Sequence, residues 1–182
     1  GAGLSGASLT GATIDGANLS DTTAYGLTEA MFASTANYAS GNLQSIVLAD
    51  NDLTGWDLSG QDLSNADFTD ADMAGADLLG ATFTGVELQG ASVTGANFSG
   101  ATDHGLTYDQ FKRTASYTGK QLEGMDLSDN DLAGWSFSSS DLSNVDFSNS
   151  ELTGAKMDAT TLTGTSFAGA IVTGVDLSGV TS

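Results

Sequence analysis

A large apolar residue stands at every fifth position through most of the chain, as in the stretch 43–98. A period of five fits neither the 3.6-residue turn of an α-helix nor the two-residue alternation of a long β-strand. It fits a short extended segment followed by a turn. In such a segment the large residue and the small residue two places before it point inward, and the residue between them points outward. The Gly and Ser residues that follow suit the tight corner.

The repeated unit reads A-(D/N)-L-(S/T)-G, for example in NADFT, GADLL, GANFS and GVDLS. These pentads resemble the pentapeptide-repeat family. Four of them occupy 1–20, thirteen occupy 35–99 and thirteen occupy 114–178, which together make 150 of the 182 residues. The resemblance implies an all-β fold, a right-handed quadrilateral parallel β-helix with four pentads per coil. Its coils would stack at about the ordinary strand spacing of ~4.8 Å.

A longer repeat of 79 residues lies over the pentads and contains a 14-residue insert, 21–34 and again 100–113. The following residues recur 79 positions later: Leu27, Phe32, Tyr38, Trp56 and Phe68 recur as Leu106, Phe111, Tyr117, Trp135 and Phe147. Because 79 residues do not divide into coils of 20, the insert must supply a missing face or bulge out at a corner. Modules of this kind resemble repeats of secreted bacterial pentapeptide proteins.

The chain is therefore expected to be a single solenoid, 1–182, in successive parts. These are the end of a module (1–20), a helical insert (21–34), thirteen pentads (35–99), a second helical insert (100–113), thirteen pentads (114–178) and a tail (179–182). A start without Met is expected of a processed product or an excised fragment.

Both inserts have the sequence features of short helices. Thr28 and Thr107 are suited to act as N-caps. The pairs Leu27–Phe32 and Leu106–Phe111 stand at the positions of a hydrophobic staple. Helices this short are not stable alone and must pack on the solenoid.

Each Trp occupies a position that the pentad pattern reserves for a small inward residue. Trp56 and Trp135 are therefore expected to distort their face or to cover the insert. The inserts are also where a specific lateral contact is expected. The residues proposed for it are Phe32, Trp56, Phe111, Lys112, Arg113 and Trp135.

The sequence gives little support for catalysis. The only histidine, His104, corresponds to Tyr25 in the preceding module, so it does not belong to a repeated site. No GxSxG, HExxH or GxxxxGK motif is present. An enzyme is therefore not expected.

The triplet Asp-Asn-Asp occurs twice, 79 residues apart, and offers hard oxygen ligands of the kind that Ca²⁺ prefers. The candidate calcium ligands are Asp50, Asp52, Asp129 and Asp131. The alternative is that Asp is simply a suitable outward residue of the pentad. Asn51 and Asn130 count as inward residues, and we expect them to bond backbone groups rather than a metal.

The charge of the chain is strongly negative, with 23 acidic residues against four basic ones and a net charge of −19. Direct binding of nucleic acid is not expected, because phosphate contacts need clustered Lys and Arg. The absence of cysteine excludes disulfides and thiolate metal sites. No apolar run is long enough for insertion into a membrane.

The favoured function is that of a non-enzymatic structural or surface protein, located extracellularly or on the cell surface. A rigid acidic rod of this kind is expected to form homo-oligomers by stacking end to end, or to belong to a longer extracellular repeat protein, since open solenoid ends must be capped, extended or paired. One alternative is a DNA mimic that inhibits or protects DNA gyrase, a role known among proteins that the chain resembles. Another is a calcium-binding adhesion module.

Overall fold

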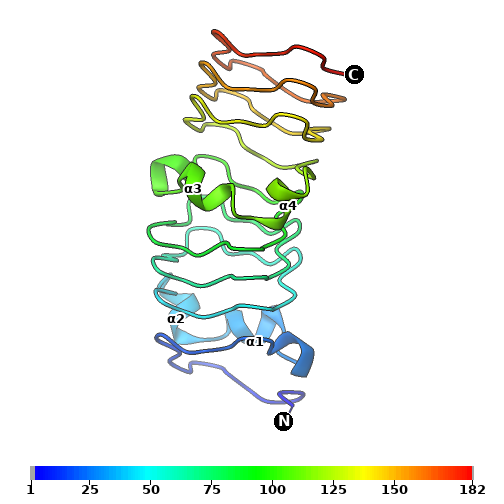
Figure 1. Ribbon diagram of the computed structural model, residues 1–182. Coiled ribbons are helices and arrows are strands. Elements are labelled where there is room, and N and C mark those ends of the chain that lie inside the picture. The colour runs from blue at the N-terminus through cyan, green and yellow to red at the C-terminus, as the bar shows by residue number, and fades with distance from the viewer. Residues whose placement is uncertain (1–2, 182) are drawn as a thin grey trace.

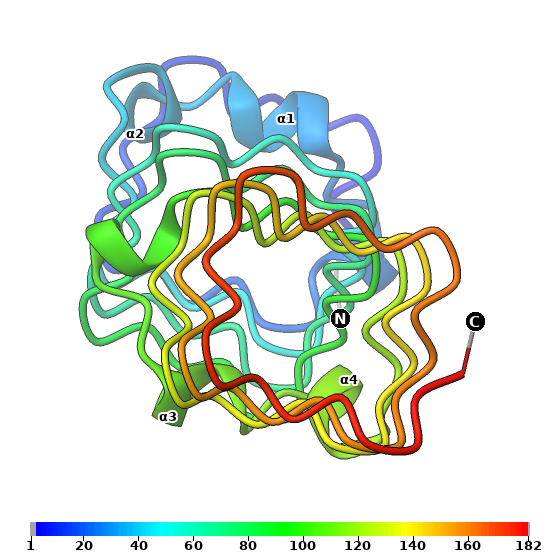
Figure 2. The ribbon, with the colours of Figure 1, turned by 90° about the horizontal axis from the view of Figure 1, so that it is seen from above.

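The computed structural model describes residues 3–181, which wind into a stack of coils with the two chain ends at opposite ends of the stack (Figure 1). Neighbouring coils are joined by parallel bridges between residues 20 positions apart, as in the series Asn42, Asp62, Thr82. Each side of a coil is one pentad, so four pentads complete a coil. The view along the stack shows the successive coils lying over one another (Figure 2).

The β-structure is reduced to single bridging residues. Among residues 3–181 no strand is longer than one bridge residue, and each bridge residue is followed, after one further residue, by a two-residue turn. The expected all-β class is corrected in this respect: the coils pair in parallel, but their straight segments are too short between corners to form extended strands.

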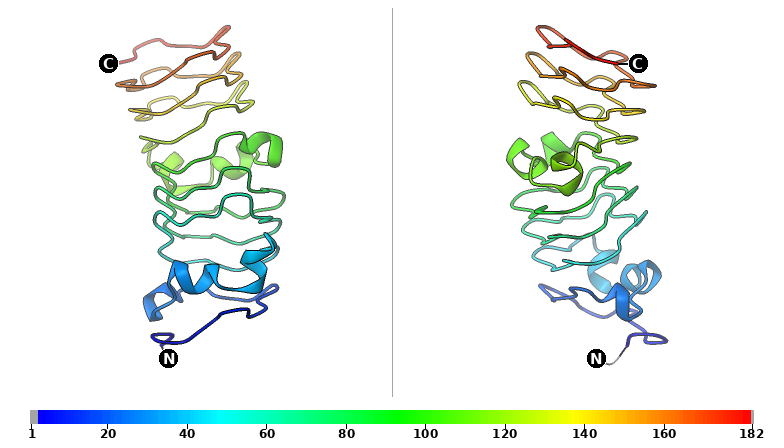
Figure 3. Two further views of the ribbon diagram at one scale, coloured as in Figure 1. Left: turned by 180° about the vertical axis from the view of Figure 1, so that it is seen from behind. Right: turned by 45° about the vertical axis from the view of Figure 1, so that its right-hand side comes forward.

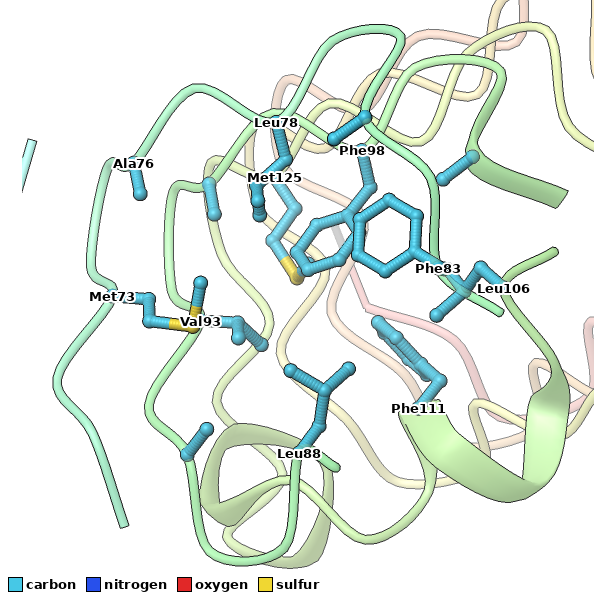
Figure 4. Close-up of a cluster of buried hydrophobic side chains, with 14 of the residues drawn as sticks. Met73, Ala76, Leu78, Phe83, Leu88, Val93, Phe98, Leu106, Phe111 and Met125 are labelled. Carbon is cyan, nitrogen blue, oxygen red and sulfur yellow. The ribbon is translucent and has the colours of Figure 1, made fainter. Parts of the chain in front are cut away.

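Inward and outward positions follow the pattern that the sequence predicts. The large residues Leu63 and Phe68 and the small residue Ala66 are all completely buried. Like side chains stack on one another along the interior, as in the parallel rings of Phe147 and Phe167, whose centroids lie 5.5 Å apart. Figure 4 shows the same packing between the coils around the second insert. Burial of each such side chain contributes about 1.5–3 kcal/mol, so the interior ladders are the main source of stability.

The corners of the coils require the left-handed backbone conformation. Most corners carry glycine at a φ near +70°, for example Gly75 at +67°. At most of the other corners Asn or Asp takes the position, as at Asn65 (+60°) and Asp70 (+56°). These two residue types tolerate that conformation best after glycine, which explains their place in the repeat.

Two coils contain helices, and the helices extend beyond the predicted inserts. The first contains η1 (Thr23–Tyr25), α1 (Glu29–Ala33) and α2 (Ala36–Ala39), and the second contains η2 (Ala101–His104), α3 (Tyr108–Phe111) and α4 (Ala115–Thr118). From here on, the first insert is residues 23–39 and the second insert is residues 101–118. None of the described helices is long and apolar enough to cross a membrane.

The predicted helix starts are confirmed. The hydroxyl of Thr28 accepts a hydrogen bond from Met31 N, and Thr107 forms a capping box with Gln110. Leu27 and Phe32, the predicted staple residues, are both buried.

The helices α2 and α4 occupy positions that the sequence assigned to pentads. Thr35 and Thr114 act as N-caps there, because their hydroxyls accept hydrogen bonds from the backbone N–H groups of Tyr38 and Tyr117. These two tyrosines are consequently only half buried and do not belong to the inward ladder. The regular pentads resume at residues 42 and 121.

The inserts rotate successive modules by half a coil. Asn18 bridges Val47 and Asn97 bridges Asp126, both 29 positions later, so each helical coil is nine residues longer than a regular one. The insert therefore replaces two sides of the coil, those between the bridge residues Asn18 and Asn42 in the first module, and also bulges outward. Without those nine residues a 79-residue module contains 14 pentads, or three and a half coils.

The bridge pattern shows this rotation directly. One vertical series runs through Asn18, Val47, Asp67 and Glu87, and another runs through Asp57, Asp77, Asn97 and Asp126. Asn18 and Asn97 are equivalent residues of successive modules, yet they lie in series that are two sides of the coil apart. The helices α1 and α2 accordingly lie on the opposite side of the rod from α3 and α4 (Figure 2), at a different height along it (Figure 3).

Candidate functional site

A buried asparagine holds the start of each insert. Asn130 is 2% exposed, and its Nδ2 donates to the carbonyl oxygens of Phe98 (2.9 Å) and Ser128 (3.0 Å). Its Oδ1 accepts from Thr102 N at 2.8 Å, at the start of η2. Asn51 bonds Leu19 O and Thr23 N in the same way in the first module. The expectation that both Asn side chains bond backbone groups is confirmed.

The aspartates beside these asparagines are not gathered around a common point. Asp50 and Asp129 occupy corners with φ near +58° and are exposed, whereas Asp52 and Asp131 accept hydrogen bonds from backbone N–H groups two residues later. Within residues 3–181 no group of three acidic or histidine side chains is placed to hold a metal ion. The recurrence of the triplet is explained by the central Asn, which the insert requires.

The aromatic residues of the inserts belong to the interior. Phe32 and Phe111 are completely buried, and Trp56 and Trp135 are 6% and 7% exposed. In each module the Trp ring lies 5.4 Å from the Phe ring of the insert, so the Trp covers the insert as one of the two alternatives predicted.

The proposed contact residues must therefore be corrected. Phe32, Trp56, Phe111 and Trp135 fill the space that the longer coil opens in the interior, and they present no surface to a partner. Lys112 and Arg113 do lie at the surface. His104 is exposed as well.

Where the helices interrupt the parallel bridges, side chains of the insert form hydrogen bonds with the backbone of the following coil instead. In the second module Tyr117 donates its hydroxyl to Ser136 O at 2.7 Å, and the Tyr108 hydroxyl accepts from Ser136 N at 3.3 Å. Burial, together with the hydrogen bond to Tyr108, raises the pKa of Tyr117 far above its ordinary value. In the first module the carboxylate of Glu29 accepts from Asp57 N at 2.8 Å. Equivalent positions are thus anionic in one module and neutral in the next.

The basic residues lie around these tyrosines. Lys112 Nζ lies 5.7 Å from the centroid of the Tyr108 ring, and Lys120 Nζ lies 5.0 Å from that of Tyr117. Lys112 pairs with Asp109 at 2.5 Å and Arg113 with Glu87 at 3.8 Å. All four of these ion-pair side chains are exposed, so the pairs contribute little to stability.

Several outward aspartates are held in their charged form by the residue two places later. The hydroxyl and the backbone N–H of Ser64 both donate to the carboxylate of Asp62, at 2.6 and 3.0 Å. The hydroxyl bond is the largest cause of the lowered pKa of Asp62, and burial opposes it. Asp57 and Asp141 have lowered pKa values for the same reason.

The Ser64→Ala variant is expected to raise the pKa of Asp62 toward its ordinary value, because the hydroxyl donor is lost. A carboxyl whose pKa is lower in the folded than in the unfolded state stabilises the protein above the unfolded pKa, about 3.9 for Asp, and this stabilisation disappears as pH falls through the folded pKa. The variant should therefore be less stable than the wild type above the unfolded pKa, and the difference should shrink as pH falls through the folded pKa of Asp62 in the wild type. NMR titration of the carboxyl carbons measures the change directly. Ser59→Ala, which removes the donor to Asp57 instead, should leave the Asp62 pKa unchanged.

The C-terminal end of the stack exposes the apolar interior. Phe167, Val172, Val175 and Leu177 line a hollow of about 170 Å³. Of the six large apolar residues that are exposed in the described chain, four lie in this last coil: Ile171 at 52%, Val172 at 47%, Leu177 at 46% and Val180 at 37%.

Backbone groups are unpaired at both ends. Within the stack, a large inward residue donates its N–H to the residue 19 places later, as Phe147 does to Ser166 O at 2.9 Å. Among the described residues no acceptor meets the N–H groups of Phe167, Val172 and Leu177. At the N-terminal end the carbonyl oxygens of the outward residues Ser8 and Thr13 likewise receive no backbone hydrogen bond from a described residue.

Comparison with solved structures returns pentapeptide repeat proteins at low TM-scores. One is the protein Rfr23 of the cyanobacterium Cyanothece 51142, 16% identical over 77% of this chain and 86% of that chain, with a TM-score of 0.31. Another is QnrB1, a plasmid-mediated fluoroquinolone resistance protein, 20% identical over 97% of this chain and 75% of that chain (TM-score 0.33). A third comes from the thylakoid lumen of Arabidopsis thaliana, 30% identical over 69% of this chain and 64% of that chain (TM-score 0.25).

Comparison with curated protein sequences gives no significant match. The family model "Pentapeptide repeats" matches in eight copies, over residues 1–26, 42–78, 62–100 and 140–179. These ranges cover more than half of the chain, and they leave out α1 to α4. The chain therefore belongs to the pentapeptide-repeat family.

Proposed function

We propose that the protein is a non-enzymatic structural rod whose copies stack head to tail through the open ends of the solenoid. The observation that carries the proposal is the exposed apolar hollow in the last coil, formed by Phe167, Val172, Val175 and Leu177. Burying such an apolar cross-section against a matching surface, of a second copy or of further coils, is favourable.

The backbone groups at the two ends complement each other. The C-terminal end offers the N–H groups of Phe167, Val172 and Leu177, and the N-terminal end offers the carbonyl oxygens of outward residues such as Ser8 and Thr13. These are the two partners that bond between neighbouring coils inside the stack. A first coil placed on a last coil would therefore continue the hydrogen-bond pattern of the solenoid.

The side chains of the first coil match as well. Leu4, Leu9 and Ile14 pack against the interior from below but are only partly buried. In a head-to-tail contact they would pack against the inward residues of the last coil, as the inward residues of successive coils do inside the stack. Regular pentads form both end coils, so the bulky inserts do not obstruct the contact.

A head-to-tail contact joins two different surfaces, so it does not close on itself. Such contacts generate open filaments when the rotation between copies does not close a ring. The coils of a longer repeat protein would satisfy the same ends in the same way.

Association of the wild-type protein should rise with concentration and depend on the last coil. The double variant Val172→Lys/Leu177→Lys, called the end-blocked variant below, places two charges in the proposed contact. In 1 M salt, where contacts between charged surfaces are screened but apolar contacts persist, it should sediment as a single chain at all concentrations. The matched control is Tyr25→Lys/Leu79→Lys, which replaces two apolar residues, each 49% exposed, on the walls of the rod. The control should associate as the wild type does.

Sedimentation velocity in 1 M salt, over a wide range of concentration, measures all three proteins. The proposal fails if the wild type remains a single chain throughout. It fails equally if the end-blocked variant associates as strongly as the wild type.

A further inference from the structure

Equivalent faces of the two modules carry opposite charge. In the first module Glu29, Asp57 and Asp77 lie together, since Glu29 bonds Asp57 N and Asp57 bridges Asp77 in the next coil. We call these three residues the acidic face. The residues 79 positions later are Tyr108, Ser136 and Lys156.

The second module adds three more basic residues at this place. Lys112, Arg113 and Lys120 stand where the first module has Ala33, Ser34 and Gly41. Tyr108 and Tyr117, which contact Ser136, lie under Lys112 and Lys120, and Ser136 bridges Lys156. All four basic residues of the chain therefore surround Ser136. We call Lys112, Arg113, Lys120 and Lys156 the basic face.

From this charge pattern we propose that the protein also associates side by side, with the basic face of one copy seated against the acidic face of a second copy. A chain with a net charge of −19 repels its own copies over most of its surface. At the basic face the four basic residues outnumber the carboxylates beside them: Asp109 and Glu87 form ion pairs there, and Asp176 bridges Lys156 in the next coil. A carboxylate-rich surface fits there, and the acidic face of a second copy is such a surface. The backbone beneath the two faces has the same shape.

The existing ion pairs do not prevent the contact. The Lys112–Asp109 and Arg113–Glu87 pairs join exposed side chains, and such pairs contribute little. Lys156 forms no ion pair with a described residue. At an ionic strength of 0.1 M the Debye length is about 10 Å, so the charges that face each other in the contact outweigh the distant charges of the two rods.

The positions of the two faces determine the kind of assembly. Asp57 and Asp77 lie in the same vertical series as Asp126, whereas Ser136 and Lys156 lie two sides of the coil away. The faces therefore point in opposite directions, three and a half coils or about 17 Å apart along the axis. Each copy can contact one neighbour on either side, and parallel neighbours would be displaced by about 17 Å. The result is a staggered sheet of rods, an assembly that end stacking alone does not produce.

Charge reversal tests the contact. Two variants are made in the end-blocked variant, so that head-to-tail stacking does not contribute. The first, Lys112→Glu/Lys156→Asp, reverses the basic face, and the second, Asp57→Lys/Asp77→Lys, reverses the acidic face. Exchange at positions 77 and 156 inserts the residue that the other module carries there, so the fold should tolerate it. The charge-preserving control is Lys112→Arg/Arg113→Lys.

The end-blocked variant should self-associate at 0.1 M ionic strength and dissociate in 1 M salt, where the Debye length is about 3 Å. Each reversed variant alone should associate at least about tenfold more weakly, because like charges then face each other. An equimolar mixture of the two reversed variants should recover the affinity to within about threefold, and the control should stay within about twofold. Sedimentation equilibrium measures these affinities, and far-UV circular dichroism checks that each variant is folded.

Two results would overturn the proposal. One is an end-blocked variant that remains a single chain at 0.1 M ionic strength. The other is a mixture of the reversed variants that associates no better than either variant alone. Because the ends are blocked throughout, neither result bears on head-to-tail stacking. If the wild type does not stack head to tail, the lateral contact can still be tested in the same way.

Discussion

The variant Phe111→Ala is expected to lose about 3–5 kcal/mol of its free energy of unfolding, the usual cost of truncating a completely buried aromatic residue. Phe111 has no exposed surface and lies at the centre of the second insert (Figure 4). Its ring centroid lies close to those of Trp135 (5.4 Å), Tyr117 (5.9 Å), Phe98 (6.3 Å) and Phe137 (6.5 Å). Removal of the ring leaves a cavity where the helical coil meets the regular coils.

Urea denaturation followed by tryptophan fluorescence measures the loss, since Trp135 reports on the same place. Leu79→Ala is the matched surface control, because Leu79 is 49% exposed, and it should change the free energy of unfolding by no more than about 0.5 kcal/mol. A loss below about 1 kcal/mol for Phe111→Ala would mean that the insert is not an integral part of the interior.

The variant Asn130→Leu should lose about 1–3 kcal/mol of its free energy of unfolding, although leucine is apolar and nearly the same size. Asn130 makes three hydrogen bonds to backbone groups, and it is 2% exposed. The variant leaves the Thr102 N–H without its acceptor, and such an unsatisfied group costs about 1–3 kcal/mol. The carbonyl oxygens of Phe98 and Ser128 keep the backbone donors Ala101 N and Gly100 N.

A corner asparagine provides the comparison. Asn144 has a φ of +59° and an exposed side chain, and glycine adopts that conformation readily, so Asn144→Gly should stay within about 1 kcal/mol of the wild type. Thermal unfolding of the two variants side by side gives the difference. Equal losses of stability in Asn130→Leu and Asn144→Gly would show that the Asp-Asn-Asp triplets do not have this structural role.

The five-residue period predicted the interior well, because one steric rule repeats with little variation. Every coil needs a large and a small inward residue on each side, and the positions of Leu63, Ala66 and Phe68 follow from counting alone. The role of Asn51 and Asn130 was predictable for the same reason. A polar residue at an inward position must bond the backbone around it.

The helices were predictable only in part. α1 and α3 were found from their N-cap threonines, whereas α2 and α4 were missed because Tyr38 and Tyr117 keep the five-residue spacing of the ladder. The available signal was Thr35 and Thr114, a second possible N-cap in each insert. Counting in fives gave these threonines the interpretation of ordinary turn residues. The half-coil rotation between modules depends on how many residues the helices take out of the coil, and that number becomes known only once both helices of an insert are identified.

Four of the six predicted contact residues were wrong, because large recurring residues were interpreted as exposed ones. Phe32, Trp56, Phe111 and Trp135 stand out in the sequence because they are large and recur, but the nine additional residues of the helical coil open a space that these rings fill. The charged residues of the same set, Lys112 and Arg113, are at the surface and enter the lateral contact proposed above. Calcium binding and gyrase as a partner stay predictions, and no described feature favours either one.

Electron microscopy of the purified protein at increasing concentration tests the central claim most directly. In 1 M salt, which screens the lateral contact, the head-to-tail account predicts unbranched filaments of one rod's width in dilute wild-type samples, lengthening with concentration. It predicts single short rods in the end-blocked variant Val172→Lys/Leu177→Lys under the same conditions. Wild-type samples that contain only single short rods at the highest concentration would contradict it.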